Sequence, residues 1–228
     1  MKLAALFTGG KDSTYAIYLA KQQGHEITCL ITMKSENPDS YMFHTPAIEL
    51  TELQAESMDI PIVIGGTEGI KEEELKDLEK TIQKAKDNFE FEGLITGALF
   101  SEYQSSRIEK IAEKLGLKVF SPLWHRSQEK LMEELLEKGF KFILTSVAGE
   151  GMSKDWLGKI ITNSELDKLK DLNKETGFHI AFEGGEAESL VLDCPLFKKK
   201  IKIIESEKIM ENDYTGRLIV KKAKLIKK

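Results

Sequence analysis

The sequence has few cysteines and no long apolar run. Among its 228 residues are two cysteines, Cys29 and Cys194, which are too few for a disulfide framework or a four-cysteine zinc site. No apolar run approaches the roughly 18 residues that span a bilayer. The apolar start of the chain breaks at Thr8 and lacks the pattern of a secretory signal. These absences argue against a disulfide-rich, secreted or membrane-spanning protein, and we expect a cytoplasmic globular protein.

Charge is unevenly distributed along the chain. Residues 198–228 contain 11 basic and 4 acidic residues, a net charge of +7, so residues 1–197 carry −12 of the total of −5. Lysines alternate with apolar residues in this basic tail, which favours solvated strands over a nucleic-acid-binding arm. The acidic remainder argues against tight nucleic-acid binding, because neutralisation of phosphates dominates such binding. We therefore predict no stable nucleic-acid partner and no membrane partner.

Apolar runs and amphipathic helices alternate along the first half of the chain. Thr45-Pro46 is typical of a helix start and predicts a helix that runs towards Met58. Five strands separated by helices indicate an open, mostly parallel α/β sheet, in which the strand order usually runs 3-2-1-4-5. The predicted strands are residues 2–7, 27–33, 61–64, 91–97 and 118–120.

The pattern changes in the second half. Residues 127–139 predict an amphipathic helix and residues 140–147 a strand, and strands with short turns follow from about residue 188. We therefore predict two domains: residues 1–125 with the open sheet, and residues 126–228 as a smaller, mixed α/β domain.

A glycine-rich turn lies between the first strand and the first helix, with the sequence Thr8-Gly9-Gly10-Lys11-Asp12-Ser13. Glycines allow positive φ angles and close approach of a ligand to the backbone. The amides of a helix N-terminus favour anions, and Lys11 and Ser13 add a charge and a donor. The chain has neither the Walker spacing nor a Gly-x-Gly-x-x-Gly after the first strand. The turn therefore predicts a phosphate site of another kind.

This turn resembles the pyrophosphate loop (PP-loop) of the N-type ATP pyrophosphatases, with Thr8 in place of the first serine. Together with four further segments it is similar to the diphthine–ammonia ligase family over residues 2 to about 197. The family pattern has glycine where Phe182 stands, an aromatic residue where Ala187 stands and often arginine where Ser105 stands. The four segments are Ser40–Pro46, Gly97–Arg107, Pro122–Trp124 and Glu183–Ser189 continued by Leu192–Phe197.

The resemblance implies both a fold and a reaction. The fold would be adenine nucleotide alpha hydrolase-like, with an ATP-binding pyrophosphatase domain followed by a substrate-binding domain. The reaction would use ATP and Mg²⁺ to adenylate the carboxylate of diphthine on elongation factor two. Ammonia would then give the amide diphthamide, with release of AMP and pyrophosphate. Elongation factor two and ammonia would be the partners, and a homodimer is a candidate assembly.

The resemblance also implies roles for individual residues. Aromatic faces and carboxylates suit the trimethylammonium group of diphthine. Asp12 is equally a helix-cap residue, Phe43 and Trp124 are equally core residues, and Gln104 equally caps a helix. The implied catalytic residues are Lys11, Glu183 and Glu186. Those for ATP are Thr8, Gly9, Gly10, Lys11, Asp12, Ser13, Met33 and Gly97, with Asp12 also for Mg²⁺. Those for the substrate are Tyr41, Phe43, His44, Tyr103, Gln104, Arg107, Trp124 and Glu188.

Two alternatives stay open at this point. A tRNA-modifying pyrophosphatase of the same fold would usually need a reactive cysteine and an added RNA-binding domain. A non-catalytic ATP-binding module would bind the nucleotide without releasing pyrophosphate.

Overall fold

Two β-sheets organise the chain. The computed structural model describes residues 1–37, 47–99 and 101–228, apart from the side chain of Gln104. Its residues form two compact units: residues 1–8 with 12–124, and residues 9–11 with 125–228. The glycine turn is thus divided, because residues 9–11 pack with the second unit.

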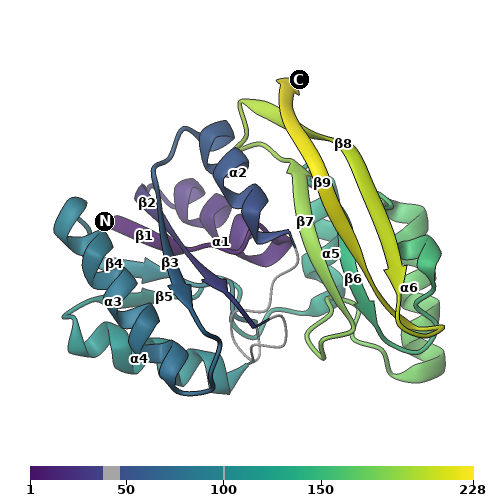
Figure 1. Ribbon diagram of the computed structural model, residues 1–228, viewed down its shortest axis with the longest axis horizontal. Coiled ribbons are helices and arrows are strands. Elements are labelled where there is room, and N and C mark those ends of the chain that lie inside the picture. The colour runs from purple at the N-terminus through teal and green to yellow at the C-terminus, as the bar shows by residue number, and fades with distance from the viewer. Residues whose placement is uncertain (38–46, 100) are drawn as a thin grey trace. The chain divides into compact units, whose positions relative to one another are not determined.

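The first unit contains a five-stranded sheet whose neighbouring strands are all parallel, in the order β3-β2-β1-β4-β5. This order confirms the predicted open α/β sheet (Figure 1). Its strands are β1 (Lys2–Leu6), β2 (Glu26–Ser35), β3 (Ile62–Thr67), β4 (Gly93–Ile95) and β5 (Lys118–Phe120). The helices are α1 (Lys11–Gln22), the 3₁₀ turn η1 (Ile48–Leu50), α2 (Thr51–Met58), α3 (Glu73–Asn88) and α4 (Glu102–Lys114).

Burial explains why these segments form a parallel sheet. Leu3, Ala4 and Ala5 of β1 are fully buried, as expected for a central strand covered on both faces. Alternate residues of β2 point to the same face, where Ile31 and Met33 join the apolar stripe of α3 in one core. This core fixes the sheet from whose first strand the glycine turn leaves.

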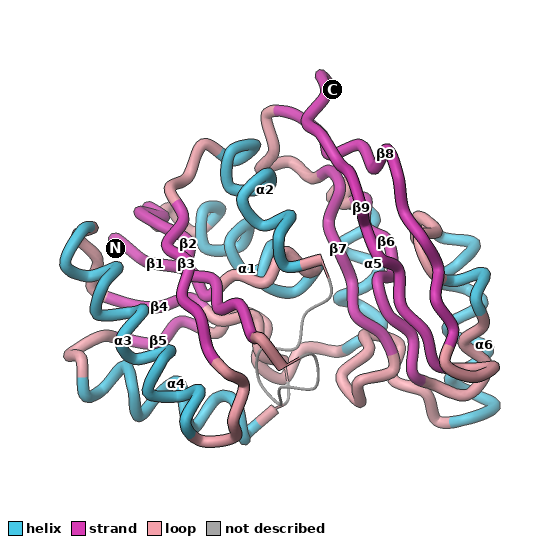
Figure 2. Tube along the Cα trace, in the orientation of Figure 1, coloured by secondary structure: helices cyan, strands magenta, loops and turns pink. Residues whose placement is uncertain are grey.

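The second unit is an antiparallel sheet with the strand order β7-β6-β9-β8. Figure 2 shows its long strands in magenta beside the helices in cyan. Helix α5 begins after Ser127, whose side chain accepts a hydrogen bond from the backbone N–H of Lys130. Its elements are α5 (Gln128–Glu137), β6 (Lys141–Ala148), the 3₁₀ turn η2 (Lys154–Trp156), α6 (Asn163–Thr176), β7 (Ala187–Asp193), β8 (Lys199–Met210) and β9 (Thr215–Lys227).

Two local features differ from the sequence-based expectation, and a third lies outside the described residues. Helix α6 was not predicted, since it is highly charged and buries few apolar residues, among them Leu166 and Leu169. Strand β4 comprises only Gly93–Ile95 and is thus shorter than the predicted residues 91–97. The predicted helix start at Thr45-Pro46 lies outside the described residues, and α2 begins at Thr51. Within the described residues, no helix is both long and apolar enough to cross a membrane.

Candidate nucleotide-binding site

The glycine turn joins the carboxyl end of β1 to the first turn of α1. Gly9 has a φ of 78°, a value that glycine adopts without strain. The backbone N–H of Thr8 donates to Oγ of Ser13 at 3.3 Å, and the two hydroxyl oxygens lie 3.1 Å apart. The two hydroxyls that were predicted to bind phosphate therefore stand together at the helix start.

Gly97 lies directly against this helix start. A Cβ atom at position 97 would come within 2.7 Å of the backbone nitrogen of Ser13 and 2.8 Å of the carbonyl carbon of Asp12. No larger residue fits there without a backbone shift. The end of the fourth strand thus meets the turn at the point where the strand order reverses, which is where open α/β sheets bind ligands.

Lys11 is held by residues of the second unit. Its ammonium group donates to the carbonyl oxygen of Ala181 at 2.7 Å and lies 5.2 Å from the centre of the Phe182 ring. Its backbone N–H donates to Oγ of Ser189 at 3.1 Å, and the backbone N–H of Val191 donates to the carbonyl of Gly9 at 3.0 Å. The side chain is 2% exposed, so the predicted phosphate-binding lysine is a buried charge here.

The carboxylate of Glu186 organises the turn before β7. One oxygen accepts the backbone N–H of His179 at 3.0 Å, and the other accepts that of Gly184 at 2.9 Å. A Cβ atom at Gly184 would lie 2.5 Å from the carboxylate, so a larger residue there would displace the Glu186 side chain. The predicted catalytic Glu186 therefore shapes the turn that carries Glu183. Glu188 is the second residue of β7.

Phe182 has an unusual backbone conformation within this turn. Its φ of 67° lies in the left-handed region, which costs an ordinary L-residue about 1–2 kcal/mol. This is the position at which the resembled family has glycine, a residue that adopts such a φ without strain. The ring is 6% exposed and makes an edge-to-face contact with Phe178 at 5.9 Å between centroids. Packing of the ring offsets part of the strain.

Tyr103 and Arg107 form a cluster with Glu72, a residue that the sequence did not single out. The guanidinium carbon of Arg107 lies 3.4 Å from the centre of the Tyr103 ring. One carboxylate oxygen of Glu72 accepts hydrogen bonds from the hydroxyl of Tyr103 at 3.1 Å and from Nε of Arg107 at 3.2 Å. The hydrogen bond from Arg107 lowers the pKa of Glu72. The two predicted substrate residues therefore share a carboxylate partner.

The remaining predicted residues are dispersed or lie outside the description. The side chain of Met33 is buried in the core beside β3, so a nucleotide would meet only its backbone. Trp124 is partly exposed at the end of the first unit. Tyr41, Phe43 and His44 lie outside the described residues, as does the side chain of Gln104.

Neither cysteine is a reactive thiol. Cys29 and Cys194 are 0% and 1% exposed. Burial raises the pKa of Cys29 to about 11 and that of Cys194 to about 12, so both thiols stay protonated at neutral pH. Among the described residues, no group of three or more histidine, cysteine, aspartate or glutamate side chains is arranged to hold a metal ion.

Sequence reasoning overlooked three partners of the predicted residues: Glu72, the carbonyl of Ala181 and Ser189. Ser189 lay within a segment that carried the family resemblance, which was a usable signal. Glu72 lies 35 positions from Arg107, and no local pattern could pair them.

Comparison with known proteins gives matches over nearly the whole chain. The family model described as the diphthamide synthase N-terminal domain matches residues 1–119, and that of the diphthamide synthase C-terminal domain matches residues 127–226. Diphthine–ammonia ligase of Mus musculus is 36% identical over a match 231 positions long. The match covers 93% of this chain and 86% of the mouse protein. Diphthine–ammonia ligase of Schizosaccharomyces pombe is 37% identical, and the match covers 91% of this chain but 37% of that longer protein.

A solved structure is similar at a lower level. The crystal structure of a predicted tRNA methyltransferase subunit from Methanocaldococcus jannaschii is 19% identical, with a TM-score of 0.45, and the match covers 86% of this chain and 98% of that one. This similarity is too distant to bear on function.

Proposed function

Since the chain belongs to the diphthamide synthase family, we propose that it amidates diphthine on elongation factor two. Its relatives carry the name of a ligase, and ligases of this family use ATP. The specific proposal is that ATP activates the diphthine carboxylate as an adenylate and that ammonia then forms the amide. AMP and pyrophosphate would be the other products.

The chemistry explains why ATP is needed. A carboxylate is a poor electrophile, because attack by ammonia would have to expel an oxide. Transfer of AMP to a carboxylate oxygen turns that oxygen into part of a good leaving group. Negative charge develops on the phosphates as the bond to pyrophosphate breaks, so fixed donors at that position lower the barrier.

We assign the donors to the glycine turn. The amides at the start of α1, with the hydroxyls of Thr8 and Ser13, would hold the β- and γ-phosphates. The ammonium of Lys11 now donates to the neutral carbonyl of Ala181. A phosphate oxygen is a stronger acceptor for a cation than a carbonyl, so we propose that ATP takes over this ammonium.

A magnesium ion would be held by the Asp12 carboxylate together with the phosphates of the bound nucleotide. Magnesium commonly binds through one or two carboxylates plus substrate phosphates. When bound, it would supply positive charge to the phosphates.

We assign the substrate to the second domain and to the cluster around Tyr103. Residues 1–125 would bind ATP and also contribute Tyr103 and Arg107 to the substrate, and residues 126–228 would bind the diphthine cation, with Glu183 and Glu188 near it. The Tyr103 ring is covered on one face by Arg107. That face is therefore closed to a trimethylammonium group, and we assign to Arg107 the substrate carboxylate instead.

The observation that carries this proposal is that both family models match the chain, the first of them across the glycine turn. Gly97 packs against this turn so closely that a Cβ atom there would lie 2.7 Å from the backbone nitrogen of Ser13. The test is an assay of purified protein with ATP, ammonia and elongation factor two that carries diphthine. AMP and pyrophosphate should form in step with diphthamide. Formation of ADP instead would refute the adenylation step.

A variant pair tests the assignment of Lys11. Lys11→Met keeps the apolar stem of a buried side chain and removes the charge, so turnover should fall at least 100-fold. Lys21→Met changes an exposed lysine of the same helix and should leave turnover unchanged. Equal turnover of the two variants would remove Lys11 from the mechanism.

The tRNA-modifying alternative gains no support from the thiols. Both cysteines of the sequence are buried and protonated at neutral pH, whereas sulfur transfer needs an accessible thiolate.

A further inference from the structure

The last two strands, β8 and β9, form a basic ribbon (residues 199–227) for which the proposed reaction has no use. They pair along nearly their whole length, whereas β9 pairs with β6 only at residues 215–217. Much of β8 is exposed, including Ile204 at 45% and Ile209 at 43%. The ribbon is thus a largely solvated two-stranded arm of the second unit.

Like charges face each other across this ribbon. Lys202 lies directly opposite Lys224, and Lys199 lies directly opposite Lys227. Directly opposed side chains approach to about 5 Å, and like charges at that separation destabilise a strand pair. Nothing in the folding of the ribbon requires lysine at these positions, since other polar residues would keep it equally solvated. An anionic partner would turn the repulsion into a shared attraction.

The lysines in and beside the ribbon differ in whether they form ion pairs. Lys221 pairs with Glu207 at 2.6 Å, and Lys228 pairs with Asp193 at 2.7 Å. By contrast, Lys200, Lys202 and Lys224 make no ion pair with any part of the chain that the structure describes. Their charges are therefore available to a partner.

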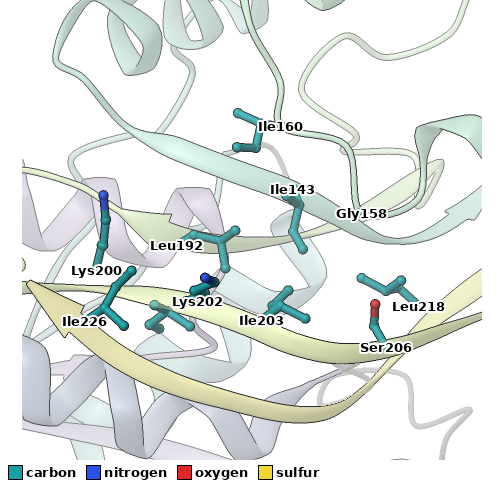
Figure 3. Close-up of a pocket in the computed structure, with 11 residues that line it drawn as sticks. Ile143, Gly158, Ile160, Leu192, Lys200, Lys202, Ile203, Ser206, Leu218 and Ile226 are labelled. Carbon is teal, nitrogen blue, oxygen red and sulfur yellow. The ribbon is translucent and has the colours of Figure 1, made fainter. Parts of the chain in front are cut away.

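An apolar groove of about 330 Å³ adjoins these lysines. Figure 3 shows Lys200 and Lys202 of β8 beside aliphatic side chains of the groove. β8 is also the outer strand of its sheet, so its outer edge can pair with an added strand. The apolar residues of the groove include Ile143, Ile160, Leu192, Ile201, Ile203, Leu218 and Ile226.

These features together select one kind of partner. Lys200 and Lys202 are two residues apart, so their side chains repeat at about 6.8 Å, as do carboxylates on one face of an extended polypeptide. Aliphatic walls fit apolar side chains, whereas single-stranded nucleic acid is held by aromatic stacking. Residues 198–228 contain one aromatic residue, Tyr214, which precedes β9 at the turn of the ribbon.

We propose that the basic end of the ribbon and the adjoining groove bind an extended, acidic and partly apolar segment of the protein substrate. This proposal rests on the proposed function, because it takes elongation factor two as that substrate. The ribbon would dock the macromolecule, while ATP and the reacting carboxylate are handled elsewhere in the chain.

The test compares two charge-reversed variants of the full chain. K202E/K224E changes the ribbon, and K84E/K110E makes the same change of charge at exposed positions on α3 and α4. Affinity for elongation factor two that carries diphthine is measured by titration calorimetry at low and high salt. We expect at least tenfold weaker binding and a smaller salt dependence for K202E/K224E, and less than a twofold change for K84E/K110E. The milder K202Q/K224Q variant should lie between the wild type and K202E/K224E.

Several outcomes would overturn the proposal. It fails if the wild type does not bind the factor, or if both variants bind as the wild type does. It also fails if K202E/K224E has the melting temperature of the wild type and still binds the factor, but no longer binds a labelled RNA oligonucleotide. The partner of the ribbon would then be RNA. Loss of a dimer in light scattering, with no change in KM for the factor, would assign the ribbon to a second copy of the chain instead.

The same experiment separates the two proposals. Wild-type protein that binds the factor but forms no AMP would refute the proposed function and leave the docking surface intact. Normal turnover by K202E/K224E with an unchanged KM for the factor would refute the docking surface alone.

Discussion

The backbone of Phe182 leads to a prediction that reverses the usual order of two substitutions. At ordinary φ angles, glycine is less stable than alanine by about 0.5–1 kcal/mol, because the unfolded chain gains freedom. At the φ of 67° observed for Phe182, alanine keeps the strain of the left-handed region and glycine relieves it. We therefore expect Phe182→Gly to be more stable than Phe182→Ala.

The magnitudes follow from the contacts of the ring. Removing a buried phenylalanine side chain costs about 3–5 kcal/mol, and the contact with the Lys11 ammonium adds about 0.5–2 kcal/mol. Both variants lose these contributions, so the difference between them isolates the backbone. Glycine relieves about 1–2 kcal/mol of backbone strain, and the usual glycine penalty is smaller. Phe182→Gly should therefore be more stable than Phe182→Ala by about 0.5–1 kcal/mol in the free energy of unfolding.

Urea unfolding followed by circular dichroism measures this difference. Phe178→Ala and Phe178→Gly form the control pair, because Phe178 is equally buried in the same segment and its φ is not positive. There, alanine should be the more stable of the two. If alanine is also the more stable at position 182, backbone strain does not explain the conformation of this turn.

Three further changes test the first unit and the charges. Gly97→Ala forces a backbone shift at Ser13, so the protein should lose about 1–3 kcal/mol of stability. Its melting temperature and its ATP affinity, both measured by calorimetry, should therefore fall. Gly66→Ala should alter neither, because a Cβ atom at Gly66 meets open space. Glu72→Gln should raise KM for the protein substrate with little change in kcat, because it loosens Tyr103 and Arg107. Glu79→Gln, on the helix that follows Glu72, should leave KM unchanged. Equal KM values for the two variants would exclude a positioning role for Glu72. The pKa of Glu165 is lowered to about 2, first by the hydrogen bond from Thr162 and then by that from Lys159, so this carboxylate stabilises the fold above about pH 4.5 and loses its effect as the pH falls towards 2. Glu165→Gln should therefore cost about 1–2 kcal/mol at pH 7 and flatten the acid limb of the stability curve, and an unchanged acid limb would contradict this.

Much of the fold could be predicted because its signals are local. The apolar run of β1 and the alternation of strands and helices gave the parallel sheet and its order. Helix α6 was not predicted, because its buried apolar stripe is narrow and lies among charged residues. The turn residues 8–13 were found from their sequence, but the burial of Lys11 beside Ala181 depends on a contact 170 positions away. Contacts between residues so far apart in the sequence produce no periodic pattern from which they could be predicted.

The same limit applies to the site. The resemblance named Tyr103, Arg107 and Glu186, yet it could not indicate that Glu72 joins the first two or that Glu186 accepts two backbone amides. The magnesium ion, the cytoplasmic location, the homodimer and the lack of a nucleic-acid partner stay predictions.

The hydrogen bonds of residues 9–11 with β7 have a consequence for how the protein is made. Lys11 and Ser189 are 178 positions apart in the chain. Its backbone groups find these partners only after β7 has been synthesised. A nascent chain that has not yet reached β7 therefore carries this turn without these hydrogen bonds.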